Sequence, residues 1–177
     1  MSRGARRLLV SALLLVPWLA VPTARGQGPS PVIPIGAPEV REGLRIAAGF
    51  LPRAPSLEPA GTAVDGAAVI HLQLDIDAVR GNPYGFDPED SIPYLKLPFV
   101  LAQDGSGRRQ EGVLAPMVSR AGFHYGVTIA LPGPGLYTLT VEIRPPEGLA
   151  RHVDPRTGVG PWWTPFPLTW TFRYPTE

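Results

Sequence analysis

Alternation of apolar and polar residues is the dominant pattern of this chain. In the run 67–79, Ile70, Leu72, Leu74 and Ile76 alternate with polar residues. A period of two places such apolar side chains on one face of a β-strand. Four further runs share the alternation, at 94–101, 123–131, 137–143 and 166–174. Since no stretch has the period of an amphipathic helix of useful length, the chain is predicted to be all-β.

Turn-forming residues separate these runs. The chain contains 23 prolines and 20 glycines, and they cluster between the apolar runs, as at 103–107 and 132–135. This distribution favours turns between strands. About seven short alternating strands in one domain predict an antiparallel β-sandwich of immunoglobulin-like type.

The N-terminus has the features of an export signal. Three arginines precede an apolar run at 8–20, and Ala24-Arg25-Gly26 offers a small-residue cleavage site. The apolar run is too short for a transmembrane helix, and no later stretch approaches its length. We therefore expect residues 1–26 to be a signal peptide, with no direct membrane insertion of the mature protein.

The remaining residues are sufficient for one domain. We expect residues 27–40 to form a flexible N-terminal segment, and residues 41–177 to form a single domain with its own core. Residues 1–26 contain four arginines and no acidic residue, so their removal lowers the formal net charge from +1 to −3. This weakly acidic balance gives no indication of nucleic-acid binding. The absence of cysteine excludes thiol catalysis and thiolate metal sites.

Soft and imidazole metal ligands are scarce in the expected mature protein. Met117 is its only methionine, and His71, His124 and His152 are its only histidines. A thioether combined with imidazoles suits copper better than magnesium or calcium. These four residues are therefore the candidates for any copper site.

Two of the histidines point away from the apolar rows of their predicted strands. His71 opens the polar face of the run 67–79, and His124 lies opposite the apolar row of the run 123–131, seven residues after Met117. A solvated outer face of a sheet explains this pattern as well as a shared metal site does. The residues alone leave both interpretations open.

An ordered series of short motifs extends from Ile46 to Tyr174. They are IAAGFLP at 46–52, LEP at 57–59, HLQLDID at 71–77, GF at 85–86, IPYL at 92–95, PMVSRAGFHYG at 116–126, RHVD at 151–154, TGVGPWW at 157–163 and PF at 165–166. The series resembles the periplasmic iron-transport accessory family of bacteria, which are copper-binding proteins associated with high-affinity ferrous iron permeases. Each motif is weak alone, but their order is highly specific.

The resemblance implies an immunoglobulin-like homodimer in the periplasm that binds copper and handles iron beside an inner-membrane iron permease. The family's copper ligands correspond to His71, Met117 and His124. A further histidine, supplied by the second subunit, corresponds to His152. A two-fold interface presents each surface twice, so a ligand contributed by the partner is physically reasonable.

The chain departs from the family pattern beside the first ligand. The family usually has a glutamate two residues after that histidine, and this chain has Gln73. An amide can offer a carbonyl oxygen to a metal but cannot neutralise its charge, so Gln73 is expected to be a weaker metal contact. Further family ligands are replaced by Leu57, Asp77, Leu149 and Ala150, which puts a second metal site in doubt.

Other readings of the polar and aromatic residues are less favourable. Asp75 and Asp77 have no convergent base or nucleophile, and no glycine-rich phosphate loop is present, so we do not expect an enzyme. The acidic loop 87–90 is expected to be a solvated turn, with a weak cation site as the alternative. Trp162 and Trp163 are expected to be packing residues, with an aromatic binding platform as the alternative.

Three functions remain for such a chain. The first is a copper- and iron-binding accessory protein of a high-affinity iron uptake system. The second is a periplasmic copper carrier or tolerance protein that is not coupled to iron uptake. The third is a metal-free sandwich that only mediates protein contacts.

Overall fold

The structure is a computed structural model that describes residues 32–60, 64 and 68–174. All regular secondary structure in these residues is β, which confirms the all-β prediction. No helix among them is long and apolar enough to cross a membrane. The expected signal peptide, residues 1–26, lies outside the described residues.

Nine strands in the described part of the chain form one antiparallel sheet. They are β1 (Ile33–Pro34), β2 (Glu39–Arg41), β3 (Leu44–Leu51), β4 (Ala68–Ala78), β5 (Leu97–Gln103), β6 (Arg109–Ser119), β7 (Gly122–Leu131), β8 (Gly135–Ile143) and β9 (Phe166–Tyr174). The order across the sheet is β1-β3-β4-β7-β6-β5-β8-β9, and β2 pairs beside β3.

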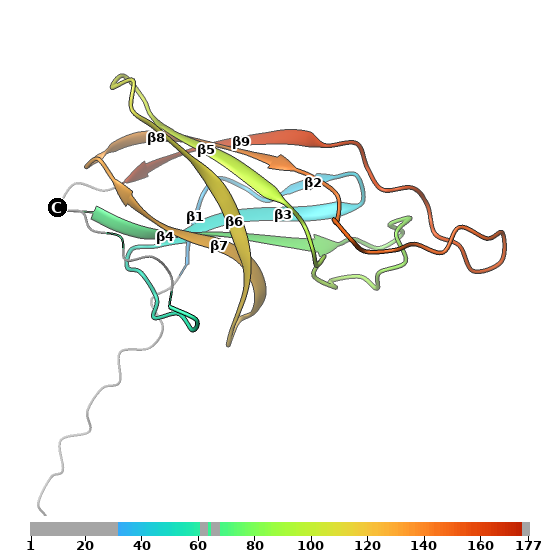
Figure 1. Ribbon diagram of the computed structural model, residues 1–177. Coiled ribbons are helices and arrows are strands. Elements are labelled where there is room, and N and C mark those ends of the chain that lie inside the picture. Colours follow the sequence, from blue (N-terminus) through green and yellow to red (C-terminus); the bar gives the residue numbers. More distant parts are fainter. Residues whose placement is uncertain (1–31, 61–63, 65–67, 175–177) are drawn as a thin grey trace, which may run out of the picture.

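Strand β6 belongs to both halves of this sheet. Its first part, 109–114, pairs with β5, and its last part, 115–119, pairs with β7. The sheet therefore curls, so that the half containing β3, β4 and β7 faces the half containing β5, β8 and β9 (Figure 1).

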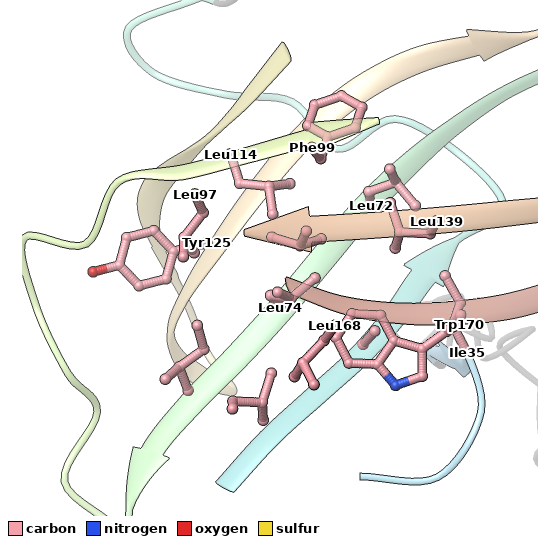
Figure 2. Packing of buried hydrophobic residues seen from close by; sticks show 14 of the residues in the cluster. Ile35, Leu72, Leu74, Leu97, Phe99, Leu114, Tyr125, Leu139, Leu168 and Trp170 are labelled. Carbon is pink, nitrogen blue, oxygen red and sulfur yellow. The ribbon is translucent and has the colours of Figure 1, made fainter. Parts of the chain in front are cut away.

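The hydrophobic core fills the space between the two halves. Leu72 and Leu74 of β4 lie close to Leu139 of β8 and to Leu168 and Trp170 of β9 (Figure 2). The apolar rows predicted on the five runs all contribute to this core. Burial of each large apolar side chain stabilises the fold by about 1.5–3 kcal/mol, which explains why the alternation fixes which face of each strand turns inward.

Two features of the sheet differ from the sequence prediction. Strand β6 was not predicted, because its side chains are mostly exposed and Leu114 is its only buried one. Strand β1 and the first two residues of β2 fall in the range 27–40, where a flexible segment was expected, and Ile35 between the two strands is buried in the core. Both strands are held in place by their pairing with β3.

Candidate metal centre

His71 lies on the outer face of β4, opposite the core. It is nevertheless only 1% exposed, so the solvated outer face considered from the sequence does not exist at this position. Its Nδ1 atom lies 3.1 Å from the hydroxyl oxygen of Thr128 on β7. Its Nε2 atom is buried and has no hydrogen-bond partner among the described residues. An unpartnered buried ring nitrogen is costly in a folded protein, and a metal ion is one means of satisfying it.

Strand register brings four of the five predicted metal residues to this face. His71 is paired with Thr128, and His124 lies four residues before Thr128, so the period of two puts it on the same face. Met117 on β6 is paired with His124. Gln73 follows His71 by two residues and so shares its face as well.

His124 is the nearest imidazole to His71. It is 6% exposed, and the centroids of the two rings lie 6.2 Å apart with their planes perpendicular. The Nδ1 atom of His124 lies 3.4 Å from the carbonyl oxygen of Gly122. The two rings are thus close enough to serve one small centre between β4 and β7.

Met117 is the cross-strand neighbour of His124. Directly paired residues have Cβ atoms about 4.5–5.5 Å apart, so the Met117 side chain starts from a position next to the His124 side chain. Within the described part of the chain, no group of three or more His, Cys, Asp or Glu side chains could hold a metal ion. A metal centre at this face would need a donor of another type beside the two imidazoles, such as the Met117 thioether.

Gln73 borders a polar cleft next to the histidine pair. The cleft has a volume of about 280 Å3, and its lining includes Gln73, His124, Asp75, Asp77 and Glu89. Gln73 is 9% exposed and donates its amide hydrogen to Asp75 across 3.1 Å. The amide oxygen is then the atom that Gln73 could offer to a cation.

The charges of the cleft are partly compensated. The Asp77 carboxylate accepts a hydrogen bond from the Ser91 hydroxyl and lies 3.6 Å from the Arg45 guanidinium. Burial nevertheless raises the pKa of Asp77 above its ordinary value. The cleft is therefore acidic but not a bare cluster of carboxylates.

His152 is not part of this face. It is exposed, on the segment 144–165 between β8 and β9, which extends beyond the end of the sheet (Figure 1). A hydrogen bond from Gly160 to Pro83 anchors this segment to the turn after β4. His71 lies seven residues before the end of β4, which puts it about 23 Å from that end of the strand at about 3.3 Å per residue. The structure thus brings together His71, Met117, His124 and Gln73, but leaves His152 elsewhere in the same chain.

Burial keeps the His71 imidazole neutral. Burial, followed by repulsion from His124, lowers the pKa of His71 from 6.5 to about 4. The imidazole is therefore neutral at pH 7 and retains a lone pair for a metal. Two imidazoles and a thioether form a donor set that suits copper.

Sequence reasoning missed two residues that contact His71. Thr128 supplies the oxygen beside Nδ1. Gly126 lies so close that a Cβ atom there would be 2.6 Å from Nε2. The signal for Gly126 was present, since a glycine inside a strand often marks a close approach. Thr128 gave no such signal, because its contact depends on the register of β4 with β7.

Comparison with known proteins gives a consistent family assignment. A sequence model described as Fe2+ transport protein matches residues 31–176. A UPF0423 protein of Brucella abortus (strain 2308) is 37% identical over 175 residues, covering 96% of this chain and 94% of that protein. The 34 kDa membrane antigen of Treponema pallidum is 33% identical over 116 residues, covering 63% of this chain and 55% of the antigen.

Solved structures of similar proteins contain copper. A copper-bound variant of FetP from uropathogenic Escherichia coli strain F11 superposes with a TM-score of 0.76 at 40% identity, covering 81% of this chain and 97% of FetP. The copper-reconstituted P19 protein of Campylobacter jejuni superposes with a TM-score of 0.75 at 39% identity, covering 81% of this chain and 96% of P19.

Proposed function

This chain belongs to the Fe2+ transport protein family, and from that membership we propose that it is a periplasmic copper-binding accessory protein of a high-affinity iron uptake system. The observation that carries the proposal is the buried, unpartnered Nε2 atom of His71 beside His124 and Met117. Copper in the similar proteins FetP and P19 supports the choice of metal.

The proposed copper site takes His71, Met117 and His124 from one subunit and His152 from a second copy of the chain. The separation of His152 from the other three within one chain supports a homodimer as the source of the fourth ligand. Gln73 would add a neutral oxygen contact. About one copper per subunit is expected, with iron as a second metal that the protein handles.

The remaining features of the proposal concern the context of the site. We infer export by the signal peptide 1–26, a non-enzymatic role and an inner-membrane iron permease as partner. Family membership supports the permease, and FetP has been expressed recombinantly in the periplasm of E. coli. The two facing halves of the curled sheet support an immunoglobulin-like sandwich as its classification.

Metal analysis and growth tests examine this function together. The mature protein, purified without chelators, should contain copper and should lose it in a His71→Ala variant. A strain lacking the gene should grow poorly under iron limitation, and the wild-type gene should restore growth while the His71→Ala gene should not. A protein that takes up no copper at micromolar concentration would refute the proposal.

A copper carrier without a role in iron uptake is the second candidate. It is favoured by one observation, namely that copper is the metal named in the related structures. Normal growth of the deletion strain under iron limitation, together with sensitivity to added copper, would select this candidate.

A further inference from the structure

All three histidines have an oxygen beside Nδ1. The partner of His71 is the Thr128 hydroxyl at 3.1 Å, that of His124 is the Gly122 carbonyl at 3.4 Å, and that of His152 is the Thr157 hydroxyl at 3.4 Å. A carbonyl oxygen can only accept, so the contact in His124 favours a proton on Nδ1. The Thr157 hydroxyl donates to Asp154 across 2.7 Å, which leaves its oxygen as the acceptor for His152.

The contact at His71 is the best defined of the three. Thr128 is paired with His71 across β4 and β7, so the pleat of the sheet holds both side chains on one face. When Nδ1–H donates to the hydroxyl oxygen, the lone pair of the imidazole is confined to Nε2. Partners of this kind fix the ring orientation of metal-binding histidines in general.

Gly126 provides the space that the ring occupies. A Cβ atom at this position would lie 2.6 Å from Nε2 and 2.9 Å from Cε1 of His71, and 3.0 Å from the carbonyl oxygen of Leu72. Gly126 does not have a positive φ, so the backbone itself would accept another residue. The two closest atoms to such a Cβ belong to the imidazole, so the His71 ring is the main reason for a glycine here, and the Leu72 carbonyl oxygen adds to the crowding.

We propose that Thr128 and Gly126 are the positioning residues of the metal centre: Thr128 holds the Nδ1–H of His71, and Gly126 leaves room for the ring, so that Nε2 is presented to the metal. This inference rests on the proposed function for its metal. The tautomer and ring orientation that it assigns to His71 apply to the metal-free protein as well.

Three variants separate positioning from general stability. Thr128→Val removes the hydroxyl at nearly constant volume, whereas Thr128→Ser keeps the hydroxyl. Gly126→Ala places a methyl group against the ring. Thr140→Val is the control for the first, because it breaks a threonine pair between β8 and β9. Gly112→Ala is the control for the second, because its Cβ would meet Phe99 at 2.7 Å, away from the centre.

The decisive readout is long-range 1H–15N NMR of the metal-free, 15N-labelled protein, with His71 signals assigned from a His71→Gln variant. Wild-type His71 should carry its proton on Nδ1. Thr128→Val should yield a tautomer mixture and Thr128→Ser the wild-type state. Gly126→Ala should shift the His71 ring signals. Both control variants should leave the tautomer and the ring signals of His71 unchanged even if they lower the melting temperature.

Copper affinity, measured by competition with a chromophoric chelator, should follow the tautomer. Thr128→Val and Gly126→Ala should each weaken binding by about 10- to 100-fold, and Thr128→Ser should recover most of it. A proton on Nε2 in the wild type, or an unchanged tautomer and affinity in Thr128→Val, would overturn the inference. Wild-type protein that binds no copper but shows the expected tautomer would instead refute the proposed function and leave the positioning of His71 established.

Discussion

Residue 73 lies where a single charge would alter the metal preference. Gln73 is nearly buried and donates to Asp75, so a Gln73→Glu substitution creates a carboxylate beside both Asp75 and the proposed metal site. A negative charge next to a poorly hydrated cation stabilises that cation far more than a neutral dipole does. We expect tighter Cu(II) binding at neutral pH, nearly unchanged Cu(I) binding, and a gain that fades as falling pH protonates the new carboxylate.

Paired titrations with Cu(II) and Cu(I) test this expectation. Gln103→Glu is a suitable control, because Gln103 ends β5 in the other half of the sheet, where its amide donates to the Pro134 carbonyl oxygen. If Gln73→Glu shows no gain for Cu(II), the side chain at position 73 does not reach the metal.

The thioether of Met117 should determine the affinity of the site for Cu(I). Met117→Leu keeps the bulk and removes the sulfur, and soft thioether ligands favour Cu(I). We expect Cu(I) affinity to fall by at least tenfold and Cu(II) affinity to change less. Competition titrations in both oxidation states measure the difference. Equal affinities for wild type and variant in both states would eliminate Met117 as a ligand.

His71 should make the stability of the metal-free protein depend on pH. Its pKa is lowered to about 4 in the folded state, so between pH 6.5 and 4 the unfolded chain binds the proton more readily. The free energy of unfolding should therefore fall as pH falls through this window, by at most about 1.4 kcal/mol per pH unit from this one group. Urea unfolding at several pH values should show a shallower decline in a His71→Gln variant.

At the scale of elements, the predictability of each strand follows from how much of it is buried. The rows of β4, β8 and β9 were evident because every second residue enters the core. Strand β6 has no such row, and Pro116 and Gly112 reduce its resemblance to a strand further. It is held by its pairing with β5 and β7, and long-range pairing leaves no local signature in the sequence.

The segment 144–165 should depend on Arg151. The Arg151 guanidinium donates to the carbonyl oxygen of Gly160 across 2.6 Å and lies over the ring of Trp162 at 5.7 Å. Trp163 beside it is buried and donates to Ile143, which confirms a packing role for that residue. We expect Arg151→Ala to lower stability by about 1.5–3 kcal/mol and to accelerate proteolysis within the segment.

Limited proteolysis with mass spectrometry locates the affected bonds. Arg151→Lys should restore little, because a lysine lacks the planar guanidinium that both contacts use. Arg156→Ala, on the same segment and exposed, is the matched control. Equal cleavage rates in Arg151→Ala and wild type would show that the other contacts suffice to order the segment.

At the scale of the whole molecule, the sequence could place candidate ligands on strand faces but not beside one another. His71 and His124 are separated by 53 positions, and only the register of β4 with β7 brings their rings within 6.2 Å. The position of His152 was equally inaccessible to strand patterns, because its segment is irregular. The motif resemblance supplied the ligand set, and the geometry of one chain accommodates three of its four members.

The proposed dimer should become more stable when copper is bound. A ligand from the partner subunit couples metal binding to association, so copper should lower the dimer dissociation constant. His152→Ala should weaken copper binding and abolish this gain. Val153→Ala, at the exposed residue that follows His152, should behave like wild type. Analytical ultracentrifugation with and without copper decides the matter, and a copper-loaded monomer at micromolar concentration would contradict the bridging role.

The shared strand β6 makes the two halves of the sheet inseparable. Its residue Ala115 pairs with β7 and the adjacent Leu114 pairs with β5, so neither half has a complete set of neighbours without it. Split fragments of this chain should consequently fail to fold unless both are present. A cut at the exposed 104–107 turn would leave β6 whole on one fragment, whereas a cut between Leu114 and Ala115 would divide the strand that joins Met117 directly to the pairing with β5.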